Sequence, residues 1–249
     1  MFFWLIRFLQ KIFPPDYGIY EKGTFPVKRK LSLSQAKSLI LAGGKRERWE
    51  KETEITLSFL KNNFLEKNKN KEIFICDYGI GIGRLALPIL KEYPKVKIVG
   101  VDESDSLLEL ARKWLPEVYF SEGRIELLKP SEFFDKYKEK TFDLLIAVYV
   151  FQHIFLEELE TLIFNLYKLL KDGGRLFIIN TFQNDDQKGR VVKIKDILAP
   201  YFEKEIEISP YENKEEYISW MRVAGYGNWQ KMEKAKLRCQ KMMGIYKKI

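Results

Sequence analysis

A glycine-rich turn at residues 77–83 is the part of this sequence best suited to holding a small ligand. Its sequence is DYGIGIG, placed after the apolar run 73–76 and before a helical pattern that begins at Arg84. Because glycine has no Cβ atom and tolerates positive φ angles, the backbone of such a turn can approach a ligand closely. A strand, a glycine-rich turn and a helix in this order are typical of sites that bind nucleotide-like molecules.

The glycine spacing excludes two common nucleotide-binding turns. A dinucleotide-binding fingerprint needs a glycine five residues after its first, and Arg84 occupies that position after Gly79. A Walker loop needs Gly-Lys followed by Ser or Thr, which is absent. The sequence therefore argues against an oxidoreductase with a nucleotide cofactor and against a Walker-type phosphate site.

The composition of the chain excludes further classes of site and of protein. The 249 residues include two cysteines, Cys76 and Cys239, and a single histidine. These are too few and too far apart for a zinc site or a disulfide framework, so we expect no metal and a reducing, cytoplasmic location. A hydrophobic content of 46% excludes a disordered chain. No apolar run reaches the roughly 18 residues of a spanning helix.

Around the turn, short apolar runs alternate with helical patterns of 10–15 residues. This alternation predicts βαβ units and a mostly parallel sheet. The predicted strands are 73–76, 96–101, 124–128, 142–148, 175–180 and 204–208, with a last strand at 244–249. The predicted helices are 46–64, 84–92, 104–115, 156–170, 192–202, 214–223 and 229–243.

Four segments follow one another in an order and spacing that belong to one family. They are the glycine-rich turn, the stretch 100–112 with Asp102 at the end of the second strand, the stretch 142–154 and the turn 169–177. Together they resemble the class I S-adenosylmethionine-dependent methyltransferases over about residues 72–180. The resemblance implies a Rossmann-like α/β fold with a seven-stranded, mostly parallel sheet, helices on both faces, and helical N- and C-terminal additions. It also implies S-adenosylmethionine as the cofactor.

The resemblance assigns roles to individual residues. The turn would cradle the methionine part of the cofactor, and Asp77 would face its ammonium group directly or through water, unless it only caps the turn. Asp102 would accept both ribose hydroxyls, since a carboxylate takes two donors at once, unless it is a plain surface residue. The implied cofactor-binding residues are Asp77, Gly79, Gly81, Gly83, Asp102, Glu103, Ser104, Ser131, Ala147 and Tyr149.

One position departs from the family pattern. Many members place an aspartate after the third strand, where it binds the adenine amino group. Ser131 stands at about that place here, followed by Glu132. Without an aspartate at this position, backbone groups are the alternative for binding the adenine amino group.

Methyl transfer is a displacement at a carbon attached to a good leaving group, so alignment and exclusion of water matter most. A general base is needed only when the acceptor carries a proton of high pKa. His153 is the candidate base, although similar enzymes carry a histidine there whatever their substrate, which also allows a site-lining role. Tyr149 is a second candidate, to orient the acceptor. Tyr17, Tyr20 and Trp49 precede the turn and are placed to cover the site, or else to pack in the core.

The net charge of +8 is concentrated at the two ends of the chain. Residues 1–50 carry +6 and residues 212–249 carry +5, whereas the centre carries −3. We expect an amphipathic helix and lid or connector at 1–45, the cofactor-binding core at 46–212, and a basic helical extension with a last strand at 213–249. The apolar face of 1–13 suits an anionic membrane surface, packing on the domain, or burial in an oligomer.

These features favour a methyltransferase acting on a small or lipid-like acceptor, in the cytoplasm or peripheral at the inner face of the membrane. The chain lacks the Asn/Asp-Pro-Pro-Tyr/Phe signature of amino-methylating DNA enzymes, and no cysteine nucleophile stands after the fourth strand. The surplus of Lys and Arg at the two ends of the chain could bind phosphates, so an RNA or other nucleic-acid methyltransferase is the alternative function. A non-catalytic cofactor-binding or scaffold protein with the same fold is the other alternative.

Overall fold

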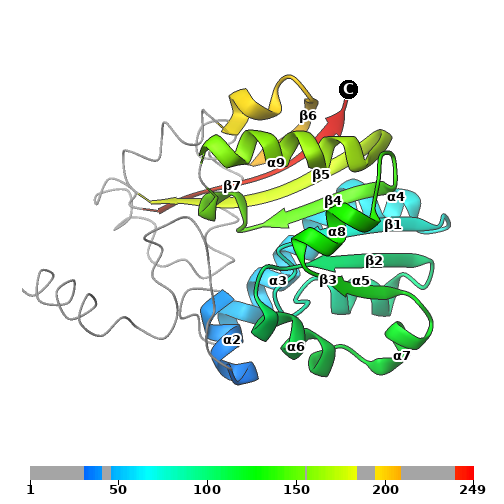
Figure 1. Ribbon diagram of the computed structural model, residues 1–249. Helices are drawn as coiled ribbons and strands as arrows, with labels where there is room; N and C mark the ends of the chain where they lie inside the picture. Colours follow the sequence, from blue (N-terminus) through cyan, green and yellow to red (C-terminus); the bar gives the residue numbers. More distant parts are fainter. Residues whose placement is uncertain (1–30, 41–45, 155, 184–193, 209–238) are drawn as a thin grey trace, which may run out of the picture.

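The computed structural model describes residues 31–40, 46–154, 156–183, 194–208 and 239–249. They form a seven-stranded sheet with the order β3-β2-β1-β4-β5-β7-β6 (Figure 1). The strands are β1 Ile73–Tyr78, β2 Val96–Val101, β3 Ile125–Leu128, β4 Phe142–Val148, β5 Leu170–Gln183, β6 Phe202–Ile208 and β7 Cys239–Lys248. The first five strands pair in parallel, and β7 pairs antiparallel with both β5 and β6.

Helices cover both faces of the sheet, which explains why β1 and β4 are almost continuously apolar. On one face the side chains of α3, α5 and α6 join the core, and on the other those of α8 and α9 do so. The main helices are α2 Leu33–Ile40, α3 Arg46–Leu60, α5 Ala86–Glu92, α6 Asp105–Trp114, α8 Pro130–Lys136 and α9 Leu156–Leu169. The shorter ones are η1 Lys61–Leu65, α4 Glu66–Asn68, α7 Glu117–Ser121 and η2 Phe151–His153.

The strand order reverses at β1, which has β2 on one side and β4 on the other. The chain passes from β1 to β2 on one side and from β4 to β5 on the other, so the connections of the adjacent strands β1 and β4 leave the carboxyl edge of the sheet in opposite directions. Such a divergence creates a crevice where ligands bind in these folds. The glycine-rich turn follows β1 at this edge. The predicted Rossmann-like α/β fold with a seven-stranded, mostly parallel sheet is therefore confirmed.

The helix predicted at 229–243 is wrong in its last residues, because β7 begins at Cys239. Met242 and Met243 lie in the cores on opposite faces of the sheet, as neighbours in a strand do. The buried middle of β7, residues 242–246, has no alternation of apolar and polar residues, so periodicity alone cannot distinguish it from a helix. The predicted last strand at 244–249 is thus part of a longer strand.

Smaller differences concern the ends of elements. β5 begins at Leu170 rather than 175, and β6 begins at Phe202, inside the helix predicted at 192–202. Residues 194–198 are helical, as expected. The predicted helices at 1–13 and 214–223, together with Tyr17 and Tyr20, lie outside the described residues. The division of the chain into three segments stays a prediction, with the qualification that β7 pairs within the main sheet.

Candidate active site

The glycine-rich turn folds over the end of β2. The amides of Gly79 and Ile80 both donate to the carbonyl oxygen of Val101, at 2.7 and 3.0 Å. Gly79, Gly81 and Gly83 have φ angles of +82°, +59° and +83°, in the left-handed region that glycine adopts without strain. The residue types of the turn are therefore dictated by its backbone path.

Asp102 joins the turn to the loop after β2. Its Oδ2 accepts the amide hydrogen of Gly81 at 2.8 Å, and its Oδ1 accepts that of Ser104 at 2.9 Å. Burial raises the pKa of Asp102, and these two amide donors oppose that rise. A carboxylate offers about four lone-pair directions, so each oxygen can accept a further hydrogen bond. This arrangement suits a ligand with two adjacent hydroxyl groups.

Asp77, the last but one residue of β1, is only 5% exposed. Burial raises the pKa of its carboxyl group to about 7, the positive charge of Arg84 lowers it, and Asp102 raises it. Arg84 is itself buried, donates to Oγ1 of Thr53 on α3 at 3.3 Å, and lies 5.9 Å from the ring of Trp49. The site thus contains a carboxyl group and a guanidinium, the two charges that complement an amino-acid zwitterion.

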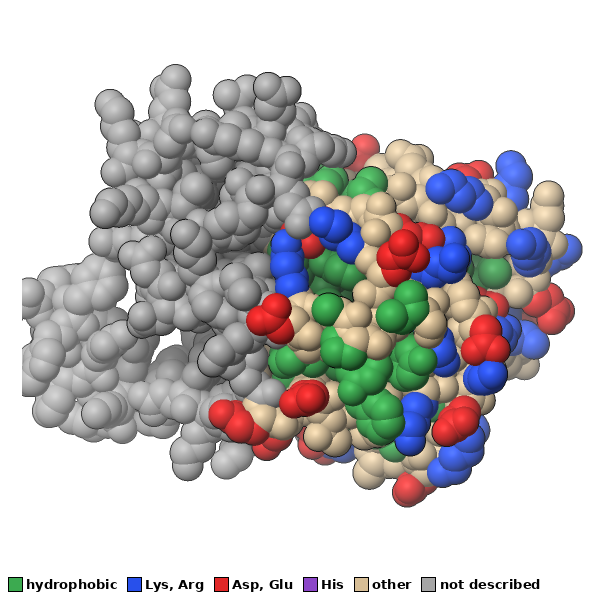
Figure 2. Space-filling view, turned by 90° about the horizontal axis from the view of Figure 1, so that it is seen from above, with side chains coloured by type: hydrophobic (Ala, Val, Ile, Leu, Met, Phe, Trp, Pro, Cys, Tyr) green, Lys and Arg blue, Asp and Glu red, His purple; other side chains and the backbone are tan. Residues whose placement is uncertain are grey.

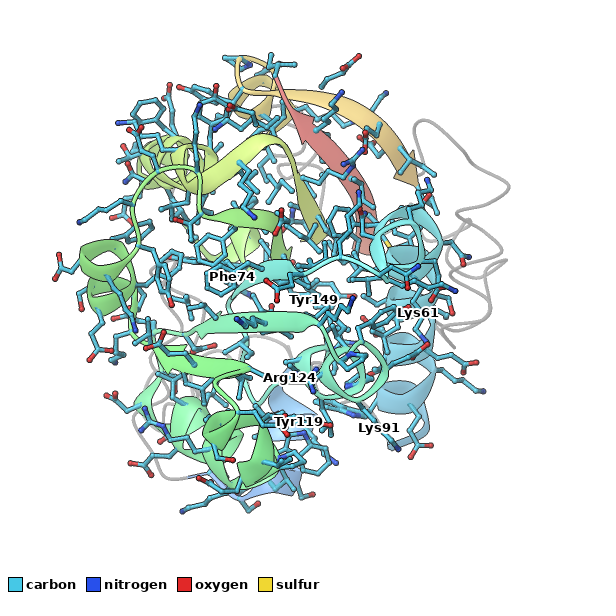
Figure 3. The ribbon with its side chains drawn as sticks, turned by 90° about the vertical axis from the view of Figure 1, so that its right-hand side faces the viewer. Lys61, Phe74, Lys91, Tyr119, Arg124 and Tyr149 are labelled. Atoms are coloured by element: carbon cyan, nitrogen blue, oxygen red, sulfur yellow. The ribbon has the colours of Figure 1, made fainter. Side chains whose placement is uncertain are left out.

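The turn after β4 contacts the glycine-rich turn directly. A Cβ atom on Gly79 would lie 2.3 Å from Cγ2 of Val150. Tyr149 precedes Val150 with φ +61°, and its hydroxyl donates to the carboxylate of Glu52 on α3. Figure 3 shows Tyr149 well inside the outline of the molecule. The structure therefore brings Gly79 against the turn that carries Tyr149, both of which the sequence assigned to one site, and adds Glu52.

Ala147 and His153 frame this turn. Ala147 is fully buried within β4, in the core on the α9 face. His153 ends η2 and is half-buried, with its Nε2 atom 3.1 Å from Nε2 of Gln152. Its place on the same edge as Tyr149 is compatible with either predicted role, and the role as a base stays a prediction.

The adenine side of the predicted site is built from charged residues. Glu132 accepts the amide hydrogen of Lys129 at 2.8 Å and so caps α8, while Ser131 is exposed. The Lys129 ammonium donates to the Glu103 carbonyl oxygen at 2.6 Å and pairs with Asp105 at 3.1 Å. Lys129 thus connects the loops after β2 and β3.

Ser104 caps α6, with its hydroxyl oxygen accepting the amide hydrogen of Leu107 at 3.3 Å. The cap places the start of α6 within one residue of the start of the helix predicted at 104–115. The adenine-binding roles of Glu103, Ser104 and Ser131 remain predictions.

Two buried polar residues carry no recognisable signal in the sequence. Glu52 is fully buried on α3, and Asn180 is fully buried near the end of β5. Neither Nδ2 nor Oδ1 of Asn180 has a hydrogen-bond partner among the described residues. A polar residue at a core position would stand out. The sequence alone, however, does not show that positions 52 and 180 are in the core.

Known proteins resemble this chain in sequence and in structure. Residues 75–174 match the methyltransferase domain family. The chain is 37% identical over 127 residues to malonyl-[acyl-carrier protein] O-methyltransferase of Priestia megaterium, covering 50% of this chain and 41% of the relative. It is 32% identical over 109 residues to the ubiquinone/menaquinone biosynthesis C-methyltransferase of Syntrophotalea carbinolica, covering 44% of each chain. The chain therefore spans less than half the length of these relatives.

Two solved structures show the same fold. A putative sarcosine dimethylglycine methyltransferase from Galdieria sulphuraria superposes with a TM-score of 0.58 at 11% identity, over 85% of this chain and 97% of the other. Magnesium protoporphyrin IX methyltransferase from Synechocystis PCC 6803, solved with bound S-adenosylmethionine, gives a TM-score of 0.55 at 15% identity, over 88% and 93%.

Proposed function

Since the chain belongs to the class I S-adenosylmethionine-dependent methyltransferases, we propose that it transfers the methyl group of this cofactor to a small or lipid-like acceptor. The single observation that carries the proposal is the pair of amide hydrogen bonds on Asp102. They orient a carboxylate against the glycine-rich turn that follows β1, with one acceptor direction left on each oxygen. A ribose fits this arrangement, because its two free hydroxyls can each donate a hydrogen bond to one oxygen of the carboxylate.

The residues at the other end of the site fit the methionine part of the cofactor. Asp77 supplies a carboxylate for the ammonium group, and the backbone of the turn leaves room for close approach. When bound, S-adenosylmethionine supplies a sulfonium whose methyl carbon is attacked by the acceptor's lone pair, while the carbon–sulfur electron pair stays on sulfur. The chain's own task is then to align the acceptor and exclude water.

The class of acceptor is proposed from the relatives. One is named for malonyl-[acyl-carrier protein] and another for ubiquinone/menaquinone biosynthesis, so both names point to acyl or lipid-like chemistry rather than to nucleic acid. A malonyl carboxylate is ionised at neutral pH and needs no base, whereas a phenol or an acidic carbon does. We assign that base, where the acceptor requires one, to His153, with Tyr149 orienting the acceptor.

The location of the protein is part of the same proposal. No helix among the described residues is long and apolar enough to cross a bilayer. We propose a cytoplasmic protein that reaches the inner membrane surface through residues 1–13, which lie outside the described part of the chain. The apolar face and the flanking basic residues of this segment support that proposal.

Calorimetric titration tests the cofactor site. S-adenosylmethionine and S-adenosylhomocysteine are titrated into the wild type, Asp102→Ala and the control Asp172→Ala. Asp172 is the matched control because its exposed carboxylate pairs with Lys140 near the start of β5, at the edge of the sheet opposite the glycine-rich turn. Loss of two hydrogen bonds to a charged group should weaken binding by more than about 100-fold in Asp102→Ala.

The control variant should bind like the wild type. Failure of folded, cofactor-free wild type to bind either compound would overturn the proposal. Cofactor binding without methyl transfer to lipids, acyl thioesters or RNA in a radiolabel screen would favour the non-catalytic alternative.

A further inference from the structure

The turn after β4 contacts three residues that are distant from it in the sequence. The amide of Tyr149 donates to the carbonyl oxygen of Ile179 on β5 at 2.6 Å. Val150 packs against Gly79 of the glycine-rich turn, and the Tyr149 hydroxyl donates to Glu52 on α3. The two strand connections that border the proposed cofactor site are therefore linked to each other and to α3.

Tyr149 has a backbone conformation that tyrosine rarely adopts. Its φ of +61° lies in the left-handed region, where a bulky side chain is an outlier. Such a conformation persists only when the surrounding contacts impose it, and it is concentrated at functional sites. The contacts of Tyr149 to β5 and α3 supply that constraint.

Glu52 is an unusual residue for its position on α3. Its side chain is fully buried, on the helix whose residues Leu57 and Leu60 belong to the core. A buried carboxylate is costly unless it is hydrogen-bonded, and an apolar residue would satisfy the packing of this helix face at lower cost. The hydroxyl of Tyr149 donates a hydrogen bond to this carboxylate, across 97 residues of chain.

The helix that carries Glu52 also contacts the glycine-rich segment. Thr53, the next residue, accepts a hydrogen bond from Arg84 at 3.3 Å, and Arg84 also faces Trp49, one turn earlier on α3. One side of α3 thus meets both connections that surround the methionine end of the proposed cofactor site. A change in the position of α3 would be transmitted to both.

We propose that Glu52 is a positioning residue for methyl transfer, acting through Tyr149. By accepting the Tyr149 hydroxyl hydrogen, Glu52 fixes the ring and the strained turn as one wall of the reaction site. This inference rests on the proposed function. A displacement of about 1 Å in such a wall is enough to reduce alignment-dependent catalysis by about 100-fold.

Four variants separate this role from plain packing. Glu52→Gln keeps a hydrogen-bond acceptor, Glu52→Met keeps the length of the side chain but removes the acceptor, and Tyr149→Phe removes the donor. Glu54→Met is the matched control, because Glu54 is exposed on the same helix.

In Glu52→Met we expect kcat to fall at least about tenfold, with KM for the cofactor changed by less than about threefold. Glu52→Gln should retain most of the activity. Because Glu52 acts through Tyr149, Glu52→Met should cost nothing further in a Tyr149→Phe background. The inference is overturned by a full additional loss in the double variant, or by Glu52→Gln behaving like Glu52→Met.

Hydrogen exchange measured on the cofactor-free protein gives a readout that needs no turnover. Peptides covering 148–154 should exchange faster in Glu52→Met and Tyr149→Phe than in the wild type and Glu54→Met. Unchanged exchange in both variants contradicts the inference even where the cofactor binds. If the wild type fails to bind S-adenosylhomocysteine, the proposed function fails separately, and the exchange data still report whether Glu52 holds the turn.

Discussion

The carboxyl group of Asp77 titrates close to neutral pH because burial raises its pKa to about 7 against the opposing charge of Arg84. A ligand ammonium group needs the ionised form, so binding should lower this pKa and release a proton. We therefore expect cofactor affinity to rise as the pH increases from 6 to 7.5 and then to level off. Calorimetry at each pH in two buffers of different ionisation enthalpy measures both the affinity and the proton release.

Asp77→Asn is the control for this effect. It should bind more weakly at pH 8, and its affinity should not change with pH over this range. A wild-type affinity that is equally flat would contradict the assignment of Asp77 to the ammonium group.

Asn180 offers a second test at the residue scale. Its amide is fully buried and has no hydrogen-bond partner among the described residues, which costs free energy. Asn180→Leu should therefore raise the free energy of unfolding by about 1–2 kcal/mol, measured by urea denaturation. Destabilisation instead would mean that the amide has a partner in the folded protein.

Local patterns allowed some site residues to be predicted and others not. Asp77 and Asp102 could be found because each lies in a short segment whose spacing is diagnostic. Glu52 and Asn180 could not, because their significance depends on burial and, for Glu52, on a partner 97 residues away. A single sequence does not reveal such partners.

At the scale of elements, Arg124 links the start of β3 to the end of α5. Its guanidinium donates to the carbonyl oxygens of Leu90 and Tyr93, at 2.6 and 2.8 Å, and to that of Val96 at 3.3 Å. It also lies 5.1 Å from the ring of Tyr119, and Figure 3 shows these two residues close together. A cation at a helix carboxyl end satisfies carbonyl groups that the helix itself leaves unpaired.

Arg124→Ala should therefore lower the free energy of unfolding by about 2–3 kcal/mol, and Arg124→Lys by less, because lysine lacks the forked geometry. The exposed Arg112→Ala on α6 should change it by less than about 0.5 kcal/mol. Urea denaturation measures all three. Arg124 lies at the amino edge of the sheet, whereas the proposed cofactor site lies at the carboxyl edge. The affinity of Arg124→Ala for S-adenosylhomocysteine should therefore be unchanged, and a large loss of affinity would contradict the placement of the site.

The elements differ in how well periodicity predicted them. Parallel strands between amphipathic helices gave clear signals, and α6 begins at Asp105, one residue after the predicted start of that helix. Part of β7 is predicted as a helix because consecutive apolar residues, including Met242 and Met243, pack in the cores on opposite faces of the sheet and so show no alternation. Only its pairing with β5 and β6, both distant in sequence, decides its conformation.

At the scale of the whole molecule, the basic surplus of the chain lies mainly in its end segments. Residues 51–211 carry −3, and Figure 2 shows Lys and Arg side chains interspersed with Asp and Glu on the described surface seen from above. Such a mixed surface gives little net attraction to an anionic partner. Attraction of the protein to anionic surfaces should therefore depend on residues 1–50 and 212–249.

This distribution leads to a prediction about membrane binding. Raising the salt from 0.1 to 1 M shortens the Debye length from about 10 to about 3 Å, which removes attraction between exposed charges but not insertion of apolar side chains. We expect the full chain to stay partly bound at 1 M salt to vesicles containing phosphatidylglycerol. Removal of residues 1–15 should abolish this salt-resistant fraction in co-sedimentation.

A point variant guards against effects of the truncation on folding. Leu9→Asp places a charge on the apolar side of the first segment and should reduce the salt-resistant fraction without changing the cofactor affinity. RNA is the comparison ligand, since binding through Lys and Arg alone is lost at high salt. If 1 M salt releases the full chain completely from vesicles as well as from RNA, residues 1–13 do not insert, and their apolar face is left to cover protein.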